Sequence, residues 1–123
     1  LVAMDVDDFK PINDQYGHGV GDQTLIRVVE HLEACVRKSD LLARWGGDEF
    51  MVVLPKSSLD TAKELAERIR HKIKAAAPLG ALNVTLSLGV VERRMGESPA
   101  ALMARADQAL YRSKAAGKDG VSE

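Results

Sequence analysis

The residues with the clearest potential for chemistry are two adjacent carboxylates, Asp48 and Glu49, which directly follow the glycine pair Gly46 and Gly47. A glycine pair between two strand-like stretches predicts a two-residue hairpin turn, because glycine adopts the positive φ that this turn requires. Successive side chains of a strand point to opposite faces, so we expect only one acid to contact a metal or substrate directly. A solvated acidic turn is the alternative interpretation.

A second acidic cluster, Asp5 to Asp8, follows the apolar stretch Leu1 to Met4, which is typical of a buried strand. Loops at the ends of buried strands commonly hold ligand sites. A calcium loop of the EF-hand type is excluded, because its sixth position requires glycine and Lys10 stands there. Carboxylates at this position instead suit a hard cation such as Mg²⁺.

The elements that must position these acids follow from the spacing of apolar residues. Steps of three and four predict helices, and alternation predicts strands. Helices are expected over residues 21–37, from 59 to an end near Pro78 and Gly80, and over 99–116. Strands are expected over residues 1–4, 41–45, 49–54 and 84–90. This order contains the ferredoxin-like β-α-β-β-α-β unit and indicates an α+β fold, with a central antiparallel sheet flanked by helices.

The topology predicts that the two acidic clusters meet. If the first strand lies in the middle of the sheet, the hairpin turn lies at the edge where that strand ends. Asp5 and Asp48 would then face each other across neighbouring strands, and pairing on one face favours Asp48 over Glu49 as the partner. The carbonyl of Val6 would add a third oxygen ligand.

Composition restricts the class of protein. A chain of 123 residues with 46% hydrophobic content suits one compact domain, and a net charge of −1 argues against a broad nucleic-acid-binding surface. No apolar stretch is long enough to cross a bilayer, so we expect no membrane contact by this segment. Its single cysteine, Cys35, lies on an apolar helical stripe and is expected in the core. A lone thiol fits a reducing, cytoplasmic location, although the parent protein could be anchored to a membrane.

Three segments share their order and spacing with a known family: DVDDFKPIND at 5–14, YGHGVGD at 16–22 and GGDEF at 46–50. Together they resemble the GGDEF family of bacterial diguanylate cyclases. The resemblance covers residues 1–123 as one domain, which lacks the family's preceding helix and the start of the first strand. It implies a palm-type cyclase fold and the condensation of two GTP molecules into cyclic di-GMP, with release of two pyrophosphates, across a homodimer.

The resemblance also implies roles for individual residues. Asp5, the Val6 carbonyl and Asp48 match the ligands of two Mg²⁺ ions, with Mn²⁺ as an alternative, and Asp48 and Glu49 match the catalytic positions. The expected substrate-binding residues are Phe9, Lys10, Asn13, His18, Asp22, Gly46, Gly47, Lys114 and Lys118. Asn13 and Asp22 would read guanine, while the lysines and the amides around Phe9 and Lys10 would hold phosphates. Ordering of the loop is the alternative role for His18, and solvation at a helix end is the alternative for the lysines.

Arg37 and Asp40, with Arg68 on the following helix, match an inhibitory product site for cyclic di-GMP. Arginine can donate a fork of hydrogen bonds to phosphate or guanine acceptors, and aspartate can accept from the guanine edge. The alternative is ordinary charge at a helix end. We expect a sensor or regulatory domain upstream in the parent protein. The main rival function is a non-catalytic receptor for cyclic di-GMP or GTP, and a second rival is nucleotidyl transfer from another triphosphate.

Overall fold

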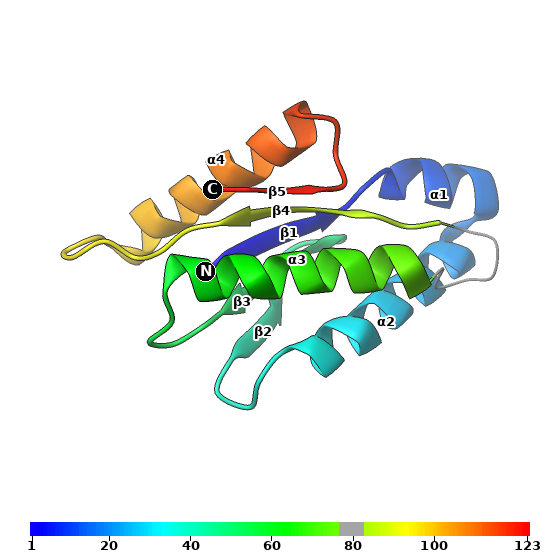
Figure 1. Ribbon diagram of the computed structural model, residues 1–123. Coiled ribbons are helices and arrows are strands. Elements are labelled where there is room, and N and C mark those ends of the chain that lie inside the picture. The colour runs from blue at the N-terminus through cyan, green and yellow to red at the C-terminus, as the bar shows by residue number, and fades with distance from the viewer. Residues whose placement is uncertain (77–82) are drawn as a thin grey trace.

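The computed structural model describes residues 1–76 and 83–123, which form a five-stranded sheet with helices on both faces (Figure 1). The strands are β1 (Val2–Val6), β2 (Leu41–Arg44), β3 (Glu49–Val53), β4 (Leu86–Val90) and β5 (Gly120–Ser122). The helices are α1 (Phe9–Tyr16), α2 (His18–Cys35), α3 (Leu59–Ala76) and α4 (Pro99–Ala115). The predicted α+β class is therefore confirmed.

The sheet has the order β2-β3-β1-β4-β5, so the N-terminal strand lies at its centre. β1 pairs antiparallel with both β3 and β4, and every residue of β1 is buried. Alternate side chains of β1 enter two cores: Val2, Met4 and Val6 pack with α2 and α3, while Ala3 packs with α4. As a consequence, β1 ends between helices that cover both faces of the sheet.

Two elements were not predicted from the sequence. The short helix α1 directly follows β1, and β5 pairs parallel with β4, which makes the sheet mixed rather than purely antiparallel. Helix α2 begins at His18 rather than Gly21 and ends at Cys35, because Val36 has an extended backbone. The predicted end of the second helix near Pro78 and Gly80 lies outside the described residues.

The hairpin turn differs from the prediction. Neither Gly46 nor Gly47 has a positive φ, so the two-residue glycine turn is wrong. Residues 45–48 connect the strands instead, and the amides of Trp45 and Gly46 both donate to the carbonyl of Glu49. The side chain of Arg44 donates to the carbonyls of Gly46 and Gly47, with a distance of 2.6 Å from Nη2 to the Gly47 oxygen. These hydrogen bonds stabilise a wider turn than the glycine pair alone would favour.

Helix α4 approaches the sheet closely at Gly89 of β4. A Cβ atom at this position would lie 2.3 Å from the backbone nitrogen of Leu110 and 2.7 Å from the carbonyl oxygen of Ala106. The hydroxyl of Ser113 also donates to the carbonyl of Leu88, at 2.6 Å. These contacts determine where the last turn of α4, including Lys114, lies above β1.

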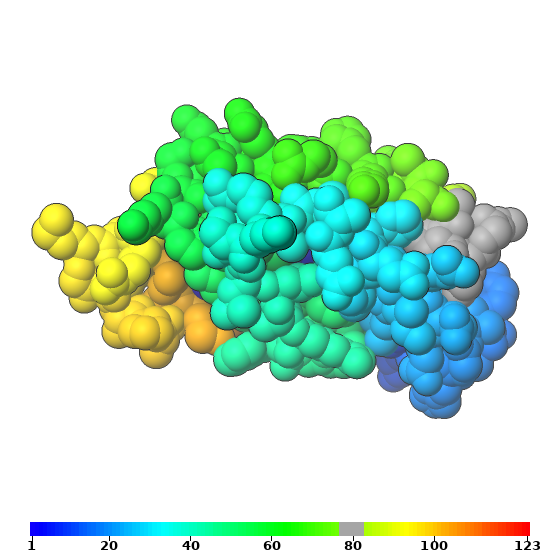
Figure 2. Space-filling model, turned by 90° about the horizontal axis from the view of Figure 1, so that it is seen from below, coloured from blue at the N-terminus to red at the C-terminus, as the bar shows by residue number. Residues whose placement is uncertain are grey.

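Seen from below, the molecule carries α1 at one end and the loop after β4 at the opposite end (Figure 2). Within residues 1–76 and 83–123, no helix combines the length and the apolar character that a membrane crossing requires.

Candidate active site at the end of β1

Two carboxylates and a lysine meet where β1 ends. The Asp5 side chain is buried and accepts a hydrogen bond from Lys114 Nζ at 2.5 Å, although 109 residues separate the two in sequence. The backbone amide of Val6 donates to the carbonyl of Asp48 at 3.1 Å, which holds the turn against the end of β1. The turn therefore lies beside the first acidic cluster, as the topology predicted.

The register contradicts one argument made from the sequence. Asp5 is paired with Glu49, not with Asp48, so the pleat directs Asp5 and Glu49 to the same face. Asp48 precedes β3 and is not bound by strand alternation, and its carboxylate is close enough to Asp5 to raise the pKa of that group. Pairing on one face therefore gives no reason to prefer Asp48, and Glu49 is also near Asp5.

The electrostatics of Asp5 fit a cation site. The pKa of Asp5 is raised to about 6, because burial, with a smaller contribution from the nearby charge of Asp48, outweighs the hydrogen bond from Lys114, which lowers it. The hydrogen bond from Lys114 thus does not offset burial and the neighbouring carboxylate, and a divalent cation would favour the ionised form of Asp5. In the described part of the chain, no group of three or more His, Cys, Asp or Glu side chains is arranged to hold a metal, so a full shell would need the Val6 carbonyl and ligand oxygens.

Further groups suited to phosphate lie next to this pair. Lys118 Nζ contacts Asp8 Oδ1 at 2.5 Å, and this hydrogen bond raises the pKa of Lys118. Asp8 precedes α1 with φ of 54° and caps none of its amides with its side chain. The first-turn amides of α1, which include Phe9 and Lys10, lack intrahelical partners by the geometry of any helix. Backbone donors and two lysines therefore surround the end of β1.

The predicted guanine-reading residues lie on α1 and α2. Asn13 Oδ1 is buried and has no hydrogen-bond partner within residues 1–76 and 83–123, and a Cβ on Gly21 would lie 1.7 Å from it. Asp22 is exposed and lines a hollow of about 540 Å³ between α2 and the hairpin, together with Arg44. His18 is exposed at the first position of α2. The structure thus brings Asn13 and Asp22 to one region, on either side of Gly21.

The three residues of the predicted product site also come together, away from β1. Arg37 donates to Asp40 from its backbone amide at 2.8 Å and from its guanidinium at 3.0 Å. Burial opposes the ionisation of Asp40, but the hydrogen bonds from Arg37 prevail and lower the pKa of Asp40. Arg68 donates to the Cys35 carbonyl, and all three line a hollow of about 130 Å³.

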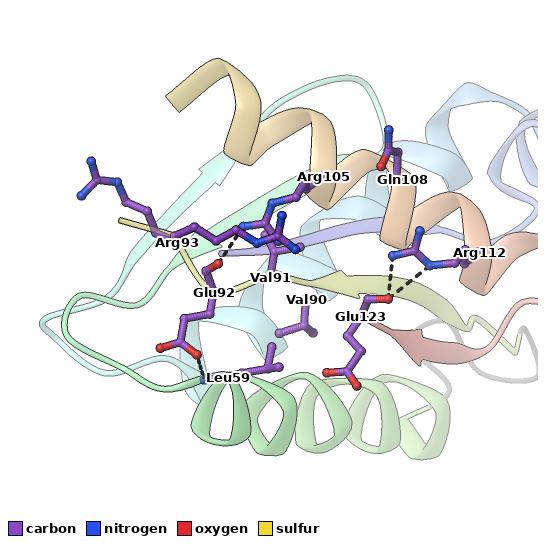
Figure 3. Close-up of a pocket in the computed structure, with 10 residues that line it drawn as sticks. Leu59, Val90, Val91, Glu92, Arg93, Arg105, Gln108, Arg112 and Glu123 are labelled. Atoms are coloured by element: carbon purple, nitrogen blue, oxygen red, sulfur yellow. Dashed lines mark hydrogen bonds between the residues drawn. The ribbon is translucent and has the colours of Figure 1, made fainter. Parts of the chain in front are cut away.

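A larger hollow of about 760 Å³ lies at the opposite end of the sheet and contains no predicted site residue (Figure 3). Two of the arginines that line it, Arg105 and Arg112, are engaged within the protein. Arg105 donates to the carbonyl of Glu92 and forms a two-bond ion pair with Glu97, and Arg112 donates to the carbonyl of Glu123.

Sequence reasoning missed three residues around the site. Arg44 holds the hairpin turn, as described above. Asp7 accepts three hydrogen bonds beside Asp5, and Asp119 follows Lys118 and joins it to α3. Arg44 could have been noticed because it directly precedes the turn. The partners of Asp7 and Asp119 are remote in sequence, so no local signal indicates them.

Comparisons with known proteins place this chain among described relatives. The family model described as "Diguanylate cyclase, GGDEF domain" matches residues 1–120. Diguanylate cyclase DgcM of Escherichia coli strain K12 is 46% identical over 121 residues, which are 98% of this chain and 30% of that protein. Diguanylate cyclase DgcP of Pseudomonas aeruginosa is 43% identical over 97% of this chain and 18% of that protein. The chain therefore spans less than a third of these relatives.

Solved structures show the same fold. The GGDEF domain of DgcB from Caulobacter crescentus, in complex with c-di-GMP, has a TM-score of 0.92 and 32% identity, over 98% of this chain and 74% of that one. Diguanylate cyclase SiaD from Pseudomonas aeruginosa, in complex with its activator SiaC, has a TM-score of 0.92 and 41% identity, over 98% of this chain and 47% of that one. With a family match along nearly its whole length, this chain belongs to the GGDEF domain family.

Proposed function

We propose that this chain is a diguanylate cyclase domain, which condenses two GTP molecules into cyclic di-GMP and two pyrophosphates. The observation that carries the proposal is the meeting of Asp5, Asp48 and Lys114 at the end of β1, beside Lys118 and the start of α1. Acidic oxygens next to basic and amide donors suit a metal–triphosphate complex. The named relatives, which are diguanylate cyclases, support the same activity.

In the proposed reaction, the 3′-hydroxyl oxygen of one GTP attacks the α-phosphorus of the other. The bond from that phosphorus to the bridging oxygen of pyrophosphate breaks, and the hydroxyl proton is lost. Asp5, Asp48 and the Val6 carbonyl would hold Mg²⁺ or Mn²⁺, which would ease ionisation of the hydroxyl and neutralise charge on the leaving group. Glu49 would support this geometry from the face that it shares with Asp5.

The two lysines are paired with carboxylates of the site before substrate binds. Lys114 pairs with Asp5 and Lys118 pairs with Asp8. Triphosphate oxygens compete for the lysines, while a cation competes for the carboxylate of Asp5, so metal and nucleotide binding should reinforce each other. The first-turn amides at Phe9 and Lys10 would donate to the terminal phosphates.

Guanine would be recognised between α1 and α2. The amide of Asn13 and the carboxylate of Asp22 can meet the donors and acceptors of the base, with His18 supporting the loop. Gly46 and Gly47 have no side chains, and a Cβ on Gly47 would meet no atom of the described residues within 4 Å, which leaves room for the nucleotide against the turn.

Each domain would supply half of the reaction. A two-fold homodimer with facing sites would place each 3′-hydroxyl against the other α-phosphate. The relatives are much longer than this chain, and we propose that an upstream sensor or regulatory domain controls the pairing. GTP as substrate and the free, buried Cys35 both suit a cytoplasmic location.

Cyclic di-GMP would also inhibit by binding at Arg37, Asp40 and Arg68. In this structure the Arg37 fork is occupied by Asp40, and the hollow beside them is small. Binding would therefore require Arg37 to turn from Asp40 towards the ligand. The Arg37 side chain is 55% accessible, which allows this movement.

The test is the formation of product by an enforced dimer. We would fuse the chain to a parallel coiled coil, add GTP with Mg²⁺ and separate the nucleotides by chromatography. We expect cyclic di-GMP and two equivalents of pyrophosphate, and Asp48→Asn should abolish both. A folded dimer that binds cyclic di-GMP but forms none from GTP would refute the cyclase assignment and favour a receptor.

A further inference from the structure

Asp7 is a buried carboxylate whose hydrogen bonds join three parts of the chain. It is 5% exposed and accepts from Ser87 Oγ at 2.6 Å, from Thr85 Oγ1 at 2.7 Å and from the backbone amide of Asp119 at 3.0 Å. Its own amide donates to the Thr85 carbonyl at 2.9 Å. The segment that follows β1 is therefore tied both to β4 and to the turn before β5.

Asp119 continues this connection to α3. Its carboxylate accepts from Arg70 Nη1 at 2.9 Å and from Lys74 Nζ at 2.6 Å. Burial opposes its ionisation, but these hydrogen bonds prevail and lower the pKa of Asp119. Its neighbour Lys118 contacts Asp8, so the two loops touch at two consecutive positions.

The backbone of both loops is in an unfavourable conformation. Asp8, Lys118 and Asp119 have φ values of 54°, 64° and 43°, in the left-handed region that residues with a Cβ rarely adopt. Such conformations are destabilising on their own, and they persist where surrounding contacts hold them. The contacts available here are those of Asp7 with Asp119 and of Lys118 with Asp8.

We infer that Asp7 and Asp119 are positioning residues for nucleotide binding: they hold the segment carrying Asp5 at a fixed distance from the turn carrying Lys118. This inference rests on the proposed function. Neither residue needs to touch the substrate, because both act through their neighbours. Asp7 lies two positions after Asp5, and Asp119 directly follows Lys118.

The binding test uses 3′-deoxy-GTP, which lacks the attacking hydroxyl, so affinity is measured without turnover. Calorimetry with Mg²⁺ and again in EDTA would compare wild type with Asp7→Asn, Asp119→Ala and Asp119→Asn. Asparagine at 7 loses acceptor capacity, whereas asparagine at 119 tolerates the left-handed backbone and keeps an acceptor for Arg70. A matched control is Glu97→Gln, which weakens the ion pair with Arg105 at the opposite end of the sheet.

We expect Asp7→Asn and Asp119→Ala to weaken 3′-deoxy-GTP binding about tenfold in Mg²⁺, as expected when a charged contact is displaced, and to weaken it in EDTA as well. Asp119→Asn should recover most of the affinity. Glu97→Gln should lower the thermal midpoint without changing the affinity. A purely structural role would instead lower the midpoint in all variants and leave binding by the folded protein unchanged.

Two outcomes separate this inference from the proposed function. If Asp7→Asn and Asp119→Ala bind 3′-deoxy-GTP as tightly as the wild type does, the positioning role alone is overturned. If the wild type fails to bind 3′-deoxy-GTP with Mg²⁺, both the proposed function and the positioning role are overturned.

Discussion

The close approach of α4 to Gly89 predicts a large effect from adding one methyl group. In Gly89→Ala the new Cβ would lie 2.3 Å from the Leu110 nitrogen, and ordinary contact begins at 3.4 Å, so α4 must move by about 1 Å. The atoms in the way are backbone atoms, which cannot rotate aside. Overpacking of this kind costs about 1–3 kcal/mol, and we expect a value near the upper limit, or a fall in the thermal midpoint of about 10 °C.

The same displacement should reach the site, because Lys114 lies one turn beyond Leu110. A shift of about 1 Å would stretch the 2.5 Å contact from Lys114 to Asp5 beyond hydrogen-bonding distance. Since misplacement on this scale can cost about a hundredfold in rate, cyclic di-GMP formation by the enforced dimer should fall further than stability alone explains.

The assay is urea denaturation followed by circular dichroism, together with product formation at a temperature where the variant is folded. Gly19→Ala is the matched control, because Gly19 lies in the first turn of α2 and a Cβ there would have nothing within 4 Å among the described residues. Equal denaturation midpoints for Gly89→Ala and wild type would refute the reasoning about α4.

Three further predictions concern other parts of the molecule. Gly21→Ala should displace Asn13, because the new Cβ would lie 1.7 Å from Asn13 Oδ1, and should raise KM for GTP at least fivefold in a steady-state assay. Arg37→Ala should weaken cyclic di-GMP binding by at least tenfold in calorimetry while leaving 3′-deoxy-GTP binding unchanged, and equal affinities would remove the product-site proposal. The hydrogen bond from Arg105 lowers the pKa of Glu97 to about 2, from an ordinary value of 4.5, so its contribution to stability is complete above about pH 4.5 and is lost as the pH falls towards 2. Glu97→Gln should therefore flatten the acid limb of a thermal-midpoint profile in that window, and parallel profiles would contradict this.

Long periodic segments allowed most of the fold to be predicted. The apolar spacing in α2, α3 and α4 is strong enough to indicate helices of 17 or 18 residues, and β1 and β4 are buried along their whole length. α1 and β5 were missed because they are short and tertiary contacts stabilise them. α1 buries only Ile12, and β5 has three residues.

The geometry of the site was harder to predict from the sequence where it depends on tertiary contacts. Side-chain hydrogen bonds from Arg44 hold the Gly46–Gly47 turn. Separately, the pairing of β1 with β3 places Glu49 opposite Asp5. Asp7 forms hydrogen bonds with residues that are separated from it by 78 to 112 positions in the sequence, and no periodic pattern can reveal such partners. The sequence shows that these polar residues lie near the predicted site, but it does not show which groups they bond to.

The placement of β1 at the centre of the sheet has a consequence for synthesis on the ribosome. β1 leaves the ribosome before the other strands of this sheet, yet one of its neighbours in the sheet is β4, and Asp5 and Asp8 pair with lysines that come much later in the sequence, Lys114 and Lys118. At about 5–20 residues per second, the apolar first strand waits several seconds for its partners. These two ion pairs at the end of β1 can therefore form only after α4 and the residues that follow it have emerged.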